Sequence, residues 1–234
     1  MKYLADIKST FDSIVFDWDE TKSNIENVYD FVVTFLNITD PYNKISTRVL
    51  EHTLRTIKIA ERLMNKEVAD KEIVIITLLL HDISKTVCEN SHNLISHRLA
   101  EIFFEKYNYL DKKKKKILDG ILYHSAKDLD SLDLTPEMKV VMDADILDEI
   151  GILLISRVCL RTHNKNLSIQ EVIKLLDNKY AKVERELSFV KTKTGREMYV
   201  QRKKKFKEYL DALKLEAAEY KINRWCIYTS SILY

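Results

Sequence analysis

Glycine and proline are scarce in this chain, with three glycines and two prolines among 234 residues. Turn-rich β architectures use both residues heavily, so this scarcity argues against a fold with many tight turns and favours long helices. Hydrophobic residues make up 46% and charged residues 32% of the sequence, which allows a sizeable core and a well-solvated surface. We therefore expect an all-α fold, a compact bundle of about eight to ten helices.

Cysteine and long apolar runs are also few. The three cysteines, Cys88, Cys159 and Cys226, are odd in number, widely spaced and form no CxxC pair, which indicates reduced thiols. No stretch reaches the roughly 18 consecutive apolar residues of a membrane span. The acidic residues among the first 20 positions do not fit a secretory or transit peptide. We expect a cytoplasmic protein that has no membrane partner.

Neither sign of charge dominates, because 38 basic and 36 acidic residues leave a net charge of +2. Such a balance argues against nucleic acid as the main partner. The lysine run at residues 112–116 is a local exception, but it lacks the interleaved aromatic residues that a platform for single-stranded nucleic acid needs. We interpret this run as a solvated helix face and do not expect nucleic acid as a partner.

Apolar residues at helical spacing predict long helices along most of the chain. One more helix is expected to begin at Thr135-Pro136-Glu137, and Ser91 is placed to cap another. The remaining predicted helices cover residues 21–37, 45–65, 70–81, 92–106, 111–124, 168–190 and 195–220.

Metal-binding side chains interrupt the most apolar of these segments. The run EIVIITLLL ends in His81-Asp82, His52 lies next to the buried stripe of its helix, and His124 closes the segment ILDGILY. The apolar run VVMDADILDEIG contains two further candidate acids, Asp143 and Asp145. A lone histidine in such a place is more often a hydrogen-bonded core residue, but buried acids without a cation each cost several kcal/mol. The residues therefore predict a divalent metal ion bound by imidazole and carboxylate groups, a donor set that suits Mn²⁺, Fe²⁺, Co²⁺, Ni²⁺ or Mg²⁺.

The order His52, His81-Asp82, Asp145 resembles the HD superfamily of metal-dependent phosphohydrolases. EHTLRTIKIAERL is similar to the first metal helix of that family, LLLHDISK to its signature, and MDADILDEIGILLISR to the closing segment of a small bacterial subgroup. The similarity continues through ILYHS and through TKTGREMYVQRKKKFKEYLDALKLE and covers about residues 45 to 217. One departure is Ser84, which stands where the family signature has glycine. The resemblance implies an HD-domain-like helical bundle.

The resemblance also implies roles for individual residues. The implied metal ligands are His52, His81, Asp82 and Asp145, with Asp143 as the alternative to Asp145. Asp82 would also orient the attacking water. Lys85 would reach a substrate phosphate. The alternative is that its positive charge only interacts favourably with the dipole at a helix C-terminus. The groups implied for substrate phosphate or for a second metal ion are Arg55, His124, Asp148 and one of His92 and His97. Arg55 could instead pair with Asp148.

The function implied by the resemblance is divalent-metal-dependent hydrolysis of a small phosphorylated substrate. A nucleotide is the first candidate, cleaved at a phosphomonoester or pyrophosphate bond by a metal-activated water. One ion is expected, and a second stays open. The alternatives are a non-catalytic sensor that binds nucleotide or metal, and an HD oxygenase with paired irons. The expected domains are a helical extension at residues 1–40, the HD-type domain at 41–220, and an apolar tail at 221–234 that could form a homodimer surface.

Overall fold

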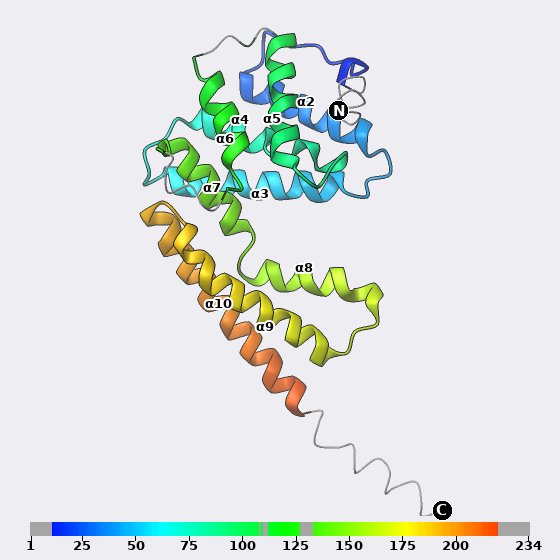
Figure 1. Ribbon diagram of the computed structural model, residues 1–234, viewed down its shortest axis with the longest axis vertical. Helices are drawn as coiled ribbons and strands as arrows, with labels where there is room; N and C mark the ends of the chain where they lie inside the picture. The colour runs from blue at the N-terminus through cyan, green and yellow to red at the C-terminus, as the bar shows by residue number, and fades with distance from the viewer. Residues whose placement is uncertain (1–10, 108, 110–111, 127–132, 220–234) are drawn as a thin grey trace, which may run out of the picture. The chain divides into compact units, whose positions relative to one another are not determined.

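The computed structural model describes residues 11–107, 109, 112–126 and 133–219 (Figure 1). These residues form α helices and short 3-10 turns, and no strand occurs among them, which confirms the predicted all-α fold. No helix in these ranges is long and apolar enough to cross a membrane. The apolar tail predicted at residues 221–234 lies outside the described residues, so its role as a dimer surface stays a prediction.

Nine α helices are present in the described residues, which lies within the predicted range of about eight to ten. They are α2 (Asn24–Thr39), α3 (Ser46–Met64), α4 (Lys71–Leu80), α5 (His92–Lys106), α6 (Lys114–Tyr123), α7 (Pro136–Asp148), α8 (Ile152–Thr162), α9 (Ile169–Glu186) and α10 (Lys193–Glu219). The 3-10 turns are η1 (Ile83–Thr86), η2 (His163–Lys165) and η3 (Leu187–Phe189).

Capping residues set several of the helix ends. Helix α2 begins at Asn24, three residues later than predicted, because Ser23 and Glu26 form a reciprocal capping box there. Ser91 does precede α5, but its backbone is left-handed (φ 58°) and its side chain makes no cap hydrogen bond with the described residues. The helix predicted from residue 111 begins at Lys114, and residue 111 itself lies outside the described part of the chain.

The chain forms two compact units. The first comprises the residues up to Asp148 together with Val190–Gly195, and the second comprises Glu149–Phe189 together with the residues from Arg196 onward. The domain boundaries predicted at residues 40, 41 and 220 stay a prediction. Helix α2, which belongs to the predicted N-terminal extension, contributes Phe31 and Phe35 to the core of the first unit.

Helix α4 is the most deeply buried helix of the first unit. Asp70 caps it by accepting hydrogen bonds from the N–H groups of Glu72 and Ile73, and every residue from Ile73 to Leu80 is buried. Burying a large aliphatic side chain stabilises a fold by about 2 kcal/mol, so this helix is held in place mainly by its apolar surface. Its C-terminal end therefore delivers the next residues, His81 and Asp82, to a fixed position inside the unit.

The second unit consists of α8, α9 and most of α10. The Tyr180 ring of α9 lies 5.6 Å from the Phe206 ring of α10. The Tyr199 hydroxyl donates to the Val183 carbonyl at 2.7 Å. Because the residue number falls along one helix as it rises along the other, these contacts show that α9 and α10 run antiparallel.

Candidate metal centre

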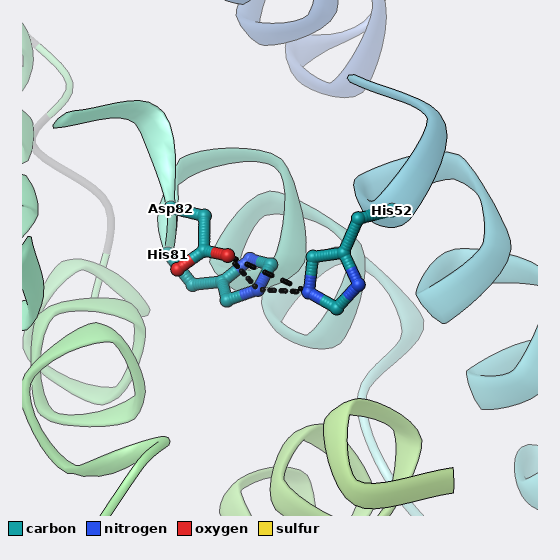
Figure 2. Close-up of side chains that lie close together, drawn as sticks. All are labelled: His52, His81 and Asp82. Carbon is teal, nitrogen blue, oxygen red and sulfur yellow. Dashed lines mark hydrogen bonds and ion pairs between the residues drawn. The ribbon is translucent and has the colours of Figure 1, made fainter. Parts of the chain in front are cut away.

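Side chains from three helices, α3, α5 and α7, and from the C-terminal ends of two more, α4 and α6, converge at one place in the first unit. Figure 2 shows three of them, His52 from α3 and His81 with Asp82 from the end of α4. Two groups of residues have ligand atoms close enough to hold a metal ion, and both groups contain Asp82. The first is His52, His81 and Asp82, and the second is Asp82, His92 and His124.

The first triad, His52 with His81 and Asp82, has the spacing of ligands around one ion. Its Nε2 atoms lie 3.3 Å apart, and Asp82 Oδ2 is 3.5 Å from His52 Nε2 and 3.4 Å from His81 Nε2. Ligand atoms bound at about 2.1 Å are about 3.0 Å apart at a right angle and about 3.4 Å apart at a tetrahedral angle. Asp145 of α7 adds a carboxylate oxygen 3.1 Å from His52 Nε2. Of the four ligands implied by the resemblance, three thus form the triad and the fourth, Asp145, contacts its member His52.

The second triad, Asp82 with His92 and His124, uses the other oxygen of the same carboxylate. Asp82 Oδ1 lies 3.4 Å from His92 Nε2 and 3.7 Å from His124 Nε2. This oxygen is buried and has no hydrogen-bond partner among the described residues. An unpaired buried carboxylate oxygen is costly. A cation between Asp82 Oδ1 and the two imidazoles would satisfy it.

Each imidazole is oriented by its other nitrogen. The Nδ1 atoms of His81 and His124 each lie 2.7 Å from the carbonyl oxygen three residues earlier, and His92 Nδ1 lies 3.1 Å from the Glu89 carbonyl oxygen in the same way. The last carbonyl groups of a helix lack helical partners, which makes those of Leu78 and Ile121 available, while Glu89 lies in the loop ahead of α5. Because a carbonyl oxygen only accepts, each Nδ1 must carry the hydrogen.

The orientation of these rings is a test of whether a metal ion fits the site. With hydrogen on Nδ1, a neutral ring presents a lone pair at Nε2. These lone pairs face the oxygens of Asp82 at 3.4 to 3.7 Å, an arrangement of acceptor against acceptor that a cation between them would relieve. Burial lowers the pKa of His81 to about 4, so that ring is neutral near pH 7. The donor set therefore fits a divalent ion.

Asp148 binds the ring nitrogen of His52 that does not face the other candidate ligands. Its Oδ2 accepts from His52 Nδ1 at 2.8 Å, and its two oxygens also accept from Arg55 Nε at 2.8 Å and from the second Arg55 terminal nitrogen at 3.0 Å. Burial alone would raise the pKa of Asp148, but the hydrogen bonds from His52 and Arg55 outweigh it and hold the pKa below its usual value. Arg55 therefore forms an ion pair with Asp148, which is one of the two roles that the sequence left open for Arg55.

Two effects change the pKa of His52 in opposite directions. Burial alone would lower the pKa of His52, but hydrogen bonds to Asp145 and Asp148 raise it to about 9. In the metal-free protein this ring is thus protonated near pH 7. An ion that binds its Nε2 must displace that proton, so we expect metal affinity to rise with pH.

Asp143 and His97 lie away from the convergent groups. Asp143 Oδ1 accepts from Lys191 N at 2.7 Å, and Asp143 Oδ2 accepts from Thr192 N at 2.8 Å and from the Thr192 hydroxyl at 2.6 Å. His97 Nδ1 faces Glu101 of its own helix at 3.8 Å. Between the alternatives left by the sequence, the structure brings Asp145 and His92 to the cluster.

Lys85 lies beside the shared carboxylate. Its ammonium group donates to Asp82 Oδ2, and its side chain is 29% exposed. Burial on its own would raise the pKa of Asp82, yet the positive charge of neighbours that include Lys85 lowers it. The carboxylate is therefore ionised and ready to bind a cation.

Two features of the centre were missed by the reading of the sequence. One is the use of main-chain carbonyls to orient His81, His92 and His124, which no side-chain pattern reveals. The other is the hydrogen bonding of Ser84, which is buried and donates to the His92 carbonyl at 2.9 Å. A serine in place of the expected glycine was the available signal.

Comparisons with known proteins agree with this geometry. The family model described as the HD domain matches residues 49–150. No curated protein matched the sequence. Three similar solved structures have the same fold at low identity. A protein from Lactobacillus plantarum is 19% identical, with 86% of this chain and 99% of that chain covered and a TM-score of 0.62.

The other two structures also share the fold at low sequence identity. An HD-superfamily hydrolase from Bacillus thuringiensis is 18% identical, with 83% of this chain and 99% of that chain covered and a TM-score of 0.62. Bacillus subtilis YpgQ, solved in complex with ADP, is 22% identical, with 80% and 97% covered and a TM-score of 0.59. Residues 49–150 thus match the HD domain, and this part of the chain contains a His/Asp cluster that could hold a metal ion.

Proposed function

We propose that this protein is a divalent-metal-dependent phosphohydrolase that acts on a small phosphorylated substrate. The observation that carries the proposal is the pair of ligand triads that share Asp82. In this proposal His52, His81, Asp82 and Asp145 hold the first ion. His92 and His124, together with Asp82 Oδ1, hold a second.

The orientation of the rings favours a second ion over a bound phosphate at His92 and His124. A neutral imidazole whose Nδ1 already donates to a carbonyl has only an acceptor left at Nε2, and phosphate oxygens need donors. Burial lowers the pKa of His92, which favours that neutral form. Asp82 would then be a ligand shared by the two sites.

A divalent ion supplies Lewis acidity, which draws electron density from a phosphoryl oxygen and makes a water molecule a better nucleophile. The residues of this chain would do the rest. Asp82 would orient the water, because its carboxylate lies at the centre of the cluster. Asp148 would hold His52 in one orientation through Nδ1. Lys85, whose side chain is 29% exposed beside Asp82, would place a positive charge next to the substrate.

A nucleotide is the substrate class that we propose. Support comes from YpgQ, which has the same fold and was solved in complex with ADP. The scissile bond would be a phosphomonoester or pyrophosphate linkage, since both place a phosphorus atom and negatively charged oxygens against the same groups.

One alternative is an oxygenase with paired irons, because the two triads would also suit two iron ions. Iron content separates the two functions: near two irons per chain together with oxygen consumption would favour the oxygenase. A non-catalytic sensor that binds nucleotide or metal is the other alternative, and it predicts binding without turnover.

The test is a screen for release of phosphate and pyrophosphate. Purified protein would be supplied with Mn²⁺, Mg²⁺, Co²⁺ or Ni²⁺ and offered nucleoside mono-, di- and triphosphates, with Asp82→Ala as the control. We expect turnover of at least one nucleotide class that disappears in the control. Turnover that persists in Asp82→Ala, or its absence throughout the panel in a metal-loaded protein, would contradict the proposal.

A further inference from the structure

Ser84 and Ser96 form a buried hydroxyl pair next to the centre. Ser84 lies in η1, Ser96 lies on α5, and both side chains are fully buried. Ser84 N donates to Ser96 Oγ at 3.2 Å, and Ser96 Oγ donates to Ser84 Oγ at 3.0 Å. Ser84 Oγ in turn donates to the His92 carbonyl at 2.9 Å. Each hydroxyl therefore donates once and accepts once, and both are satisfied.

These hydrogen bonds join two of the three parts of the chain that carry ligands of the second triad, those of Asp82 and His92. Ser84 follows Asp82 by two residues, and its bonds reach the first residue of α5, which is His92. The Ser84 carbonyl accepts from the N–H groups of Val87 and Cys88, at 2.9 and 2.8 Å, which closes the η1 turn. Ser84 thus links the turn that follows Asp82 to the start of α5, where His92 Nε2 lies 3.4 Å from Asp82 Oδ1.

Within the second triad, His92 is the ligand with the weakest support of its own. Its side chain is 21% exposed, compared with 1% for His124. The residue before it, Ser91, has a left-handed backbone and offers no side-chain cap to α5 among the described residues. The start of α5 is held at the His92 carbonyl by Ser84, and the next residue, Asn93, donates its side-chain amide to the Leu122 carbonyl at 3.0 Å. Glycine, which the family signature has at this position, could make neither hydroxyl bond.

We propose that Ser84 is a positioning residue, which holds His92 beside Asp82 through the His92 carbonyl and Ser96 and so sets the affinity of the second triad for its metal ion. This inference rests on the proposed metal centre, and it adds a residue that touches neither ion nor substrate. Partners that orient metal ligands from behind typically contribute tenfold to 100-fold in metal affinity. An effect of about tenfold is expected here, because the main chain around His92 keeps its other bonds.

The experiment is a calorimetric titration of the metal-stripped, full-length protein with Mn²⁺. It compares the wild type with Ser84→Ala and with His92→Ala, which marks the loss of the second ion. The matched control is Thr86→Val, because the Thr86 hydroxyl lies 2.7 Å from the Thr39 hydroxyl and ties the same η1 turn to α2 without reaching His92.

We expect two Mn²⁺ ions per wild-type chain. In Ser84→Ala the dissociation constant of the weaker ion should rise about tenfold. The tighter ion should change less than about twofold, and Thr86→Val should change neither. A general loss of structure would weaken the binding of both ions. Weaker binding of the second ion alone therefore identifies Ser84 as a positioning residue. Equal weakening of both ions, or an unchanged second ion, overturns the inference.

The failure of the inference and the failure of the proposed function look different in this titration. One ion per wild-type chain overturns the inference and leaves a one-ion hydrolase standing. No bound ion in the wild type contradicts the proposed function itself. Should Ser84→Ala not fold, Ser96→Ala takes its place, because it removes the partner of the Ser84 hydroxyl. An unchanged second ion in that variant also overturns the inference.

Discussion

Three aspartates on α7 make three different sets of contacts, two of them to opposite nitrogens of the His52 ring. Asp143 binds the main chain at Lys191 and Thr192, Asp145 faces His52, and Asp148 holds the other side of the His52 ring. Successive residues of a helix turn by about 100°, so Asp145 points away from Asp143 by about 200° and lies about 60° from Asp148. One short helix thus supplies an anchor, a candidate ligand and the group behind a ligand.

The role of Asp148 can be tested at the level of this one side chain. Asp148→Asn should weaken metal binding about tenfold to 100-fold, because an amide holds His52 in position less well than a carboxylate does. Metal titration of the stripped protein measures this change. Asp143→Asn on the same helix is the control, since Asp143 touches no member of the cluster. Equal metal affinity in Asp148→Asn and the wild type would contradict the role assigned to Asp148.

Asp40 gives a separate prediction about pH. Its Oδ2 accepts from Ile45 N at 2.6 Å and from Ser46 N at 2.7 Å, and these bonds lower the pKa of Asp40 from 3.8 to about 2. Because the folded pKa lies below the unfolded one, the stabilisation is present above pH 3.8 and is lost as the pH falls towards 2. Asp40→Asn should lower the free energy of unfolding at pH 6, and the difference from the wild type should shrink near pH 2. Urea unfolding at the two pH values measures it. A difference that does not depend on pH would refute the assignment.

At the scale of the elements, helix ends build the centre. His81 and His124 directly follow α4 and α6, and His92 opens α5. At each of these positions a main-chain carbonyl is free to orient an imidazole. Ligands that lie far apart in the sequence meet because the helices that carry them pack around the buried α4.

Gly195 tests how tightly the segment 190–195 is fitted against α7. A Cβ atom at this position would overlap Asp143 Oδ2 and lie 2.8 Å from Thr192 Oγ1. We expect Gly195→Ala to lower the free energy of unfolding by about 1 to 3 kcal/mol. Alanine favours a helix over glycine by about 1 kcal/mol, so without the clash the variant would be more stable than the wild type. Chemical denaturation measures the sign of the change in the free energy of unfolding. A variant more stable than the wild type would contradict the close packing of Gly195 against Asp143.

The sequence predicted the elements better than it predicted their connections. Apolar periodicity and caps are local, so the ends of α3 and α5 lie within about two residues of the predicted ones. The ligand-type residues were recognisable because polar groups in apolar runs need partners. The choice of His92 over His97, and the turning away of Asp143, depend on contacts between residues distant in sequence. The Ser84 bonds are of the same kind, and a single sequence carries no record of them.

At the scale of the whole molecule, the lysine run at 112–116 is largely neutralised by neighbouring acids. Lys113 pairs with Asp70 at 3.0 Å and with Glu72 at 2.6 Å, and burial opposes but does not outweigh the rise that these bonds cause in its pKa. Lys115 and Lys116 also have acidic partners. Lys113 and Lys116 thus attach the start of α6 to other parts of the first unit, while Lys115 pairs with Asp119 of α6 itself, which agrees with the interpretation of the run as a helix face.

Metal binding should stabilise the first unit as a whole, because a site made from five of its helices exists only in the folded state. Saturation at about 100 times the dissociation constant adds about 2.7 kcal/mol per ion. We expect Mn²⁺ to raise the melting temperature of the wild type. The effect should be larger at pH 8.5 than at pH 6, since His52, with a pKa of about 9, must lose its proton. Asp82→Asn should show little response in the same thermal scan. An equal response in that variant would place the bound metal elsewhere.

The most direct test of the central claim is the rate of phosphate or pyrophosphate release from the best nucleotide found in the screen, measured on one preparation. The rate would be taken after removal of metal with a chelator, after Mn²⁺ is restored, and in Asp82→Asn under both conditions. The account predicts that activity disappears with the metal, returns with Mn²⁺, and is reduced about 100-fold or more in Asp82→Asn even when Mn²⁺ is present. Hydrolysis that survives the chelator, or that Asp82→Asn performs at the wild-type rate, would contradict it.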